Sequence, residues 1–490
     1  MNNYRKIFLT AFLATNFFLP ALAVDTNLKI EDDIFDYSIS SYLKTIKVQK
    51  SKLEDLFKVP KFKLEANYSE SVTVSFEDIL AKAIENNLNL NIAKQNSKIA
   101  KWNYYSKFGD ALPDIILSAN YQKREGTFYL NSNFANTIDE GVASAGFRVN
   151  YRLFNGGTTL FLLLAEKYYR RATEAQEKAS YNLVLLEGSE LFFDLIREKM
   201  ALATKLKILE QAKANHALAL KFVNAGTGTK YDLLQTEARL ARVEQDLINE
   251  QANLRLSQIA LASHLNMPLY TPIDLAEELV PQLKIVDESL EINEFIKTAF
   301  EQNPNILAAI EARKAAYKEA YSTVGDFLPK VDIFYDVTGG GEDFGNLNKI
   351  NTIGFASQYN IGDGLGLNAA SHYKESRNKA QRAQLLYEQE MQSIEKGLRI
   401  SFINYQKSKS LLEASFKELN AAQEALRLAR LRYENGVEIL TNLVSREKEL
   451  SEAEFNLIDS TISYNTAQLR LLYNMGSLSV EKLLAGRING

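Results

Sequence analysis

The residue types that could bind a metal or transfer a proton are sparse in this chain. His216, His264 and His372 are its only histidines, they lie far apart in the sequence, and the chain has no cysteine. None of them stands in a HExxH-type spacing, the arrangement that would indicate a zinc site. No pairing of a nucleophile with a base recurs along the chain. We therefore expect no catalytic, cofactor-binding or metal site, and an enzyme is the least expected class of protein.

The sequence instead offers ionic interactions. Its charged candidates lie on segments in which apolar and polar residues alternate with a two-residue period. Apolar and polar residues alternate over residues 115–121, 145–153, 331–337 and 353–361. This period predicts four strands, each with one apolar and one polar face. Residues 122–142 are polar, and we expect a loop there. The polar faces carry four charged candidates for the lining of a pore: Arg148, Arg152, Asp332 and Asp336.

Very long helices must position these strands. Residues 159–224 contain no proline and one interior glycine, Gly188, and their apolar residues recur at helical spacing, which predicts a rod of roughly 100 Å. Gly226 and Gly228 predict a tight reversal after it, because glycine readily adopts left-handed conformations. The return helix repeats leucine every seven residues, which predicts left-handed coiled-coil packing. These leucines are Leu233, Leu240, Leu247, Leu254 and Leu261.

The second half of the chain repeats the first. Residues 325–329 match residues 109–113 in four of five positions, and the same offset relates Asn87 to Asn303. A second long helix, ending near residue 434, has a lone interior glycine, Gly397, and leads to another tip and another heptad seam. Such a duplication predicts tandem structural repeats. The second seam consists of Leu443, Leu450, Leu457, Tyr464 and Leu471.

The lengths of the predicted helices constrain how they pack. Each long helix has about 66 residues, each return helix about 38, and each helix before a strand pair about 33. A hairpin with one short arm would leave an apolar stripe of the long helix bare. We therefore expect the two shorter helices of each repeat to stack end to end. All strand ends would then lie at one end of the rods and both tips at the other.

The first 23 residues predict export of the chain. Arg5 and Lys6 precede a short apolar run, and Ala21 and Ala23 have the small-x-small pattern of a signal-peptidase site. No later stretch predicts a helical membrane anchor, and a net charge of -4 with mixed signs gives no reason to expect a nucleic-acid partner. The predicted domains are a signal peptide (1–23), a periplasmic lead-in (24–74), repeat 1 (75–266), a linker (267–290), repeat 2 (291–476) and a C-terminal tail (477–490).

The apolar strand faces of an exported chain need an apolar partner. Lipid is one such partner, but it requires every strand edge to be paired, as in a closed barrel. Four strands are too few to close a barrel, so several chains would have to contribute to one. The polar faces would then line a water-filled pore. Small soluble sheets with one wet face remain the alternative interpretation of the same pattern.

The order of these features resembles the TolC family of outer-membrane efflux and secretion channels. The resemblance rests on the Leu-Pro step into each first strand, the step 154–157 (Phe-Asn-Gly-Gly) out of the second, and tips in which Gly226 and Gly436 precede Asp232 and Asn442. It implies a mainly α chain with a small β part. Long coiled-coil hairpins in tandem repeats would form an α-barrel, and four strands per chain would contribute to a trimeric transmembrane β-barrel.

The resemblance also implies a function and partners. The expected protein is a homotrimeric exit duct of a tripartite efflux pump or a type I secretion system, set in outer-membrane lipid and extending into the periplasm. Its expected partners are a periplasmic adaptor (membrane fusion) protein and an inner-membrane transporter of the RND, ABC or MFS type. The expected adaptor-docking positions at the tips are Gly226, Thr229, Gly436 and Leu440.

The tips are also where the resemblance implies a gate. Family members often narrow this end with aspartates in the second return helix, but the matching residues here are Asn442 and Ser445. Asp232 and Glu438 are the acidic residues that remain near the tips, and we take all four as gate candidates. A solvated carboxylate at a helix end is the alternative role for each acid.

A non-conducting periplasmic coiled-coil adaptor or scaffold is the competing hypothesis. It explains the heptads and the tips equally well. It does not explain four strands with a lipid-like face, and such proteins usually carry an inner-membrane anchor or a lipid. Membrane fractionation would separate the two hypotheses.

Overall fold

The computed structural model describes residues 72–131, 134–276, 280, 282–287, 291–359, 366–435, 437 and 440–488. All of these belong to one compact unit, which spans Tyr68–Gly490. The predicted signal peptide and most of the predicted lead-in lie outside the described residues. Among the helices that are described, none has a stretch long and apolar enough to cross a membrane.

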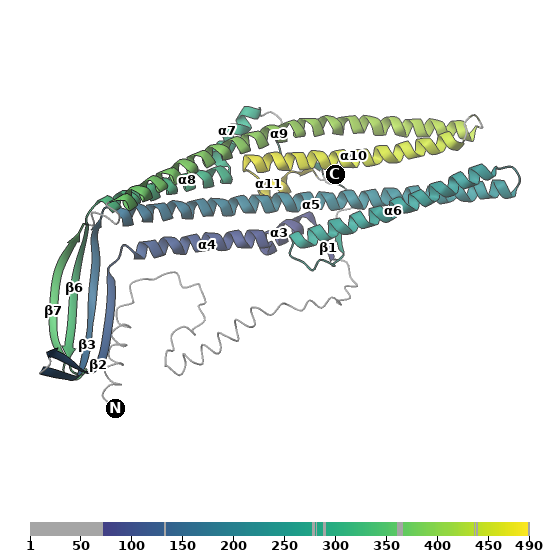
Figure 1. The fold of residues 1–490 in the computed structure, drawn as a ribbon. Coiled ribbons are helices and arrows are strands. Elements are labelled where there is room, and N and C mark those ends of the chain that lie inside the picture. The colour runs from purple at the N-terminus through teal and green to yellow at the C-terminus, as the bar shows by residue number, and fades with distance from the viewer. Residues whose placement is uncertain are drawn as a thin grey trace. The chain divides into compact units, whose positions relative to one another are not determined.

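Two helical hairpins dominate the described unit (Figure 1). The first consists of α5 (Thr158–Asn224) and α6 (Lys230–His264), and the second of α9 (Leu367–Glu434) and α10 (Leu440–Met475). In each hairpin a helix of nearly 70 residues packs against a return helix about half as long, as the sequence predicts. At the end of each heptad seam that lies away from the tip, Leu261 and Leu471 are fully buried.

Each half also has two shorter helices. They are α3 (Phe76–Asn86) and α4 (Leu88–Gly109) in the first half, and α7 (Ile292–Gln302) and α8 (Pro304–Ser322) in the second. The second helix of each pair, α4 or α8, completes the layer beside the strands. Near the strands the packing order is α4, α5, α8, α9, and near the tips it is α6, α5, α10, α9. The wall of the unit is therefore one layer of helices, four helices wide at both levels.

The prediction of one continuous helix before each strand pair is wrong. The backbone is extended at Asn87 and at Asn303, each with ψ near 120°, and this separates α3 from α4 and α7 from α8. The asparagine side chain caps the second helix of each pair, because Oδ1 of Asn87 accepts from Leu90 N at 3.2 Å and Oδ1 of Asn303 accepts from Asn305 N at 2.9 Å. An N-cap of this kind stabilises a new helix start.

The same two asparagines join the short helices end to end, as predicted. Asn87 Nδ2 donates to the backbone oxygen of His264 at 2.9 Å, at the end of α6. Asn303 Nδ2 donates to the backbone oxygen of Asn474 at 2.8 Å, near the end of α10. Each return helix therefore continues into α4 or α8 through a hydrogen-bonded joint.

The four long strands form one antiparallel sheet in the order β2-β3-β6-β7. They are β2 (Asp114–Asn131), β3 (Phe134–Asn155), β6 (Lys330–Gly341) and β7 (Asn348–Gln358). Most of residues 122–142, expected to be a loop, continues β2 and β3 in paired register, so that expectation is wrong. Tyr359 lies just beyond β7, and residue 361 lies outside the described residues.

Small elements lie beside the middle of the helix layer. β1 (Val72–Val74) pairs in parallel with β4 (Ile273–Leu275), and β5 (Gln282–Leu283) pairs with β8 (Arg487–Ile488), next to α11 (Val480–Ala485). A short 3₁₀ helix, η1 (Thr323–Phe327), precedes β6. The core extends through both halves of the helix layer, and Phe76, Phe192 and Phe193 are fully buried where α3 meets α5.

Candidate pore wall and helical tips

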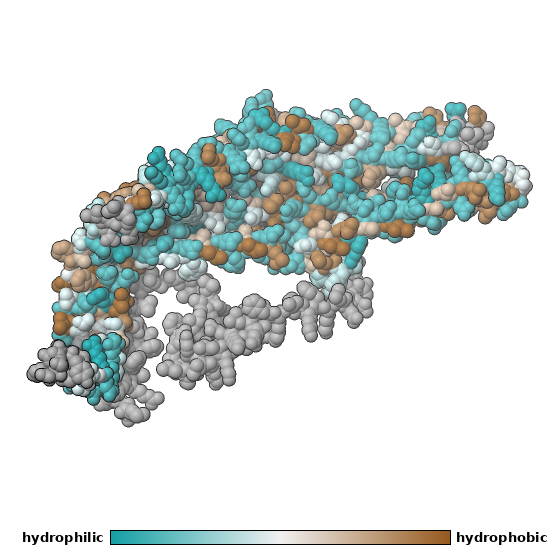
Figure 2. Space-filling model, in the orientation of Figure 1, coloured by the Kyte–Doolittle hydropathy of each residue, from teal (hydrophilic) through white to brown (hydrophobic). Residues whose placement is uncertain are grey.

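The sheet has one continuous apolar face. The register places Ile115, Val149, Tyr335 and Ile353 side by side across all four strands. Much of this face is exposed: Ile115 is 71% exposed, Ile353 80% and Phe355 77%. Hydrophobic side chains also show over the strands in the space-filling view (Figure 2). Such an exposed apolar strand surface is typical of contact with lipid or with another protein.

The opposite face brings the four predicted lining residues together as two ion pairs. Arg148 Nη2 lies 2.6 Å from Asp336 Oδ2, and Arg152 Nε lies 3.0 Å from Asp332 Oδ1. Both pairs join β3 to β6, the strands that connect the two hairpins of the sheet. Alternation predicted the shared face, but not which acid would meet which base.

Phe334 is a member of this polar face that the search for charged residues overlooked. The guanidinium carbon of Arg148 lies 5.9 Å from the centroid of its ring. Gly354 lies opposite Phe334 in the register, and a Cβ added at Gly354 would lie only 2.8 Å from the ring. The glycine therefore leaves room for the Phe334 ring. Its place in the alternation, between Asp332 and Asp336, was the available signal.

The first tip combines an open turn with a helix cap. Gly226 has φ +75° and no neighbour within 4 Å of an added Cβ. Thr229 caps α6, because its Oγ1 accepts from Asp232 N at 3.1 Å and donates to an Asp232 carboxylate oxygen at 2.5 Å. Asp232 is exposed, and its hydrogen bonds with Thr229 make it part of the local cap.

The second tip is described only in part. Gly436 and Glu438 lie outside the described residues, and Leu440 begins α10. Asn442 and Ser445 are exposed on the first turns of that helix. Ser445 Oγ donates to Glu449 Oε1 at 3.4 Å.

His264 belongs to the joint between α6 and α4. It is 8% exposed, its Nε2 lies 3.1 Å from the backbone oxygen of Val184, and its Nδ1 lies 3.7 Å from Glu187. Burial lowers the pKa of the imidazole, and the Glu187 carboxylate and the Val184 carbonyl partly oppose this shift. Within the described part of the chain, no three metal-binding side chains gather at one place.

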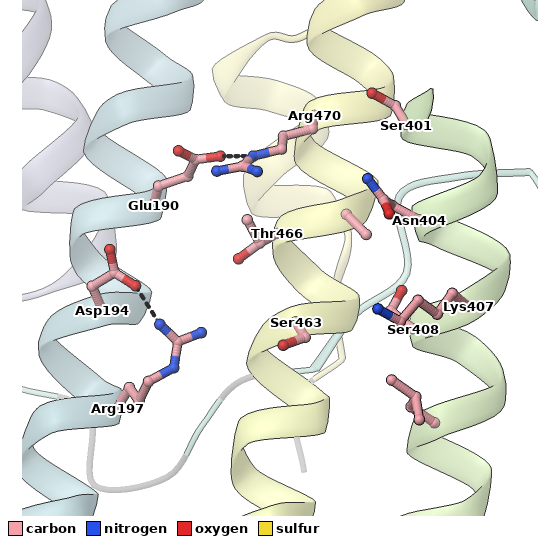
Figure 3. Close-up of a pocket in the computed structure, with 12 residues that line it drawn as sticks. Glu190, Asp194, Arg197, Ser401, Asn404, Lys407, Ser408, Ser463, Thr466 and Arg470 are labelled. Atoms are coloured by element: carbon pink, nitrogen blue, oxygen red, sulfur yellow. Dashed lines mark hydrogen bonds and ion pairs between the residues drawn. The ribbon is translucent and has the colours of Figure 1, made fainter. Parts of the chain in front are cut away.

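A polar groove between α5, α9 and α10 was missed by the sequence analysis (Figure 3). It encloses about 400 Å³. Arg470 Nε lies 2.6 Å from Glu190 Oε1, and Arg197 contacts both Asp194 at 2.6 Å and Asp459 at 2.8 Å. The spacing of Glu190, Asp194 and Arg197 along one helical face was the only signal in the sequence.

The two halves of the chain match the same protein family. The family profile described as "Outer membrane efflux protein" matches residues 79–267 and again residues 295–477. The chain is 23% identical to the outer membrane protein TolC of Vibrio cholerae, over 76% of this chain and 84% of that protein. It is 22% identical to nodulation protein T of Rhizobium leguminosarum bv. trifolii, over 81% and 88%.

Solved structures share the fold. The CmeC outer membrane channel of Campylobacter jejuni superimposes with a TM-score of 0.73 at 16% sequence identity, over 86% of this chain and 93% of that one. The two profile matches together cover most of the chain, including both long helical hairpins and the four-stranded sheet. The protein lies in the outer membrane and extends into the periplasm. The chain belongs to the outer membrane efflux protein family.

Proposed function

We propose that three copies of this chain form a channel that conducts solutes across the outer membrane. The observation that carries this proposal is the open four-stranded sheet. Its edge strands β2 and β7 each pair on one side only among the described residues, and its apolar face is exposed. In lipid, unpaired strand edges cost several kcal/mol per group. A sheet of this kind therefore needs further strands before it can enter a bilayer.

Three chains would supply those strands, in line with the homotrimer that the resemblance to the TolC family implies. Three four-stranded sheets joined edge to edge give twelve strands, which exceeds the roughly eight strands with which barrels begin to close. The apolar faces would meet lipid, and the Arg148–Asp336 and Arg152–Asp332 pairs would line the interior. A non-conducting scaffold would leave the same apolar face without a partner.

The helix layers would close into a second barrel below the sheet. The two halves repeat one plan of short helix, strand pair, long helix and return helix, and both place their tips away from the sheet. The conduit would act as the passive exit duct of a tripartite efflux pump or type I secretion system. A periplasmic adaptor would dock at the tips and open them, and an inner-membrane transporter would select the solute.

The first experiment measures assembly and conduction together. Protein extracted from outer membranes is weighed by native mass spectrometry and then inserted into planar lipid bilayers. The expected result is a trimer with discrete single-channel currents. A monomer without conductance would contradict the proposal. An Ile353→Asp variant, which places a charge on the lipid-facing side, is expected to lower the yield of inserted trimer.

The second experiment tests docking at the tips. The chain has no cysteine, so a single Gly226→Cys carries a photo-crosslinker to one tip. We expect capture of a periplasmic protein in cells, whose identity mass spectrometry reports. Lys213→Cys, on the exposed surface of α5, is the control and should capture less of it. Equal capture at both positions would contradict docking at the tip.

A further inference from the structure

The short elements cover one face of the helix layer. Phe76 of α3 packs on Phe192 of α5 with ring centroids 4.8 Å apart. Phe295 of α7 packs on Phe402 of α9 with centroids 6.0 Å apart. Asn465 of α10 accepts a hydrogen bond from the backbone of β5 at 2.9 Å. Three neighbouring helices therefore present these residues to the same side of the layer.

The polar groove of Figure 3 lies on the other face. Successive residues of an α-helix are about 100° apart, so residues two positions apart point in nearly opposite directions. Each of the three helices has a groove residue two positions from a covered one. These groove residues are Glu190 on α5, Asn404 on α9 and Ser463 on α10.

We propose that this groove faces the lumen of the conduit and that its Lys407 contacts anionic groups of the solutes that pass. The inference rests on the proposed function, because a conducting lumen must stay open. The short elements α3, α7 and β5 occupy space on one face of the layer, so they fit outside the conduit. The groove face is then the inner one.

The charges of the groove favour Lys407 as the contact. Glu190 is engaged by Arg470, and Arg197 by Asp194 and Asp459. Lys407 lines the same groove and is exposed, and no described carboxylate oxygen lies within 4 Å of its Nζ. Three-fold assembly would place three such ammonium groups at one level of the lumen, where like charges attract counter-ions.

Ion selectivity tests this proposal with a matched pair of variants. Lys409 lies two residues further along α9 and lines a cavity beside α7 on the covered face. In bilayers at low salt, Lys407→Glu is expected to shift the K⁺ to Cl⁻ permeability ratio at least about twofold toward K⁺, since screening is then weak. Lys409→Glu is expected to leave the ratio unchanged. A shift with Lys409→Glu alone, or with neither variant, overturns the proposal.

Cysteine accessibility gives an independent measurement of the face. The absence of native cysteine means that a charged, membrane-impermeant thiol reagent has no background target. Asp194→Cys in the groove should show a stepwise change of single-channel current with the reagent. Lys199→Cys should show none, because Lys199 lies on the covered face, where its Nζ is 2.7 Å from Asp274 of β4.

The outcomes separate this inference from the proposed function. If the unmodified protein forms no conducting channel, the proposed function fails. If it conducts and the reagent alters the current at Lys199→Cys but not at Asp194→Cys, only the assignment of the inner face fails. A current change at Asp194→Cys together with the Lys407→Glu shift supports the whole inference.

Discussion

Arg148 of β3 and Asp336 of β6 lie directly opposite each other in the sheet, and their side chains form an ion pair at 2.6 Å. The two strands come from different halves of the chain. Because β3 and β6 are the inner strands, this pair and the Arg152–Asp332 pair bridge the seam between the two hairpins. The seam is thus held on one face by charges and on the other by apolar contacts such as Phe147 with Tyr335.

Arg148→Ala is expected to change ion selectivity more than stability. Exposed ion pairs contribute about 1 kcal/mol or less, and the backbone ladder of β3 and β6 remains. Loss of the guanidinium leaves the Asp336 carboxylate without its partner on the polar face, which should raise the preference for cations in single-channel recordings. The Arg148→Ala/Asp336→Ala double variant should return toward the original selectivity. An unchanged ratio in the single variant would place this face away from the ion path.

Gly188→Leu is expected to destabilise the joint between α6 and α4. Even a Cβ at this position would lie 3.2 Å from His264 Nε2, so a larger side chain must displace the imidazole. Overpacking of this kind typically costs about 1–3 kcal/mol. Thermal unfolding followed by circular dichroism in detergent measures the loss. Gly109→Leu is the matched control, because a Cβ there meets no atom within 4 Å. An equal loss of thermal stability in both variants would contradict the idea that close packing against His264 makes Gly188 necessary.

Stability is expected to fall on acidification through His264. Its folded-state pKa is lowered below the ordinary value of 6.5, mainly by burial. The neutral imidazole therefore stabilises the fold fully above that value, and this contribution is lost as the pH falls through the lowered pKa. Unfolding temperatures measured between about pH 5 and pH 8 should show a smaller decline in His264→Asn, which copies Asn474 in the second half.

His372→Asn serves as the control for this pH dependence. His372 is exposed on α9, so its replacement should leave the decline as it is in the unmodified protein. If His264→Asn and the unmodified protein lose stability in parallel, other groups govern the response to acid.

Asp232→Asn is expected to lower cation preference at the first tip. The substitution removes one charge per chain but preserves the Thr229 hydroxyl that caps α6. Thr229→Ala removes the cap, at a cost of about 1 kcal/mol to the helix, and leaves the charge. Single-channel selectivity should therefore respond to the first change, while Asn442→Asp should strengthen cation preference. A response to Thr229→Ala alone would mean that the tip acts only through its structure.

Local sequence patterns were sufficient to predict those helices and strands whose formation depends on the residues within them. The two-residue alternation predicted the parts of the four strands that lie nearest the helices, because each side chain there faces either an apolar or a polar environment. The heptad leucines and the glycine tips predicted the two hairpins for the same reason. The order of these elements, found twice, was enough to indicate the family. Residues 122–142 escaped recognition because they are polar, and only their pairing with each other makes them strands.

The tertiary structure alone decided how these elements meet. Asn87 ends one helix and starts another because its side chain can cap α4 while also binding the end of α6, a partner 177 residues away. The pairing of Arg148 with Asp336 depends on the register between two strands 188 residues apart in sequence. The polar groove depends on which faces of α5, α9 and α10 the short elements cover. Each of these is a relation between distant segments, and periodicity within one segment carries no information about its partner.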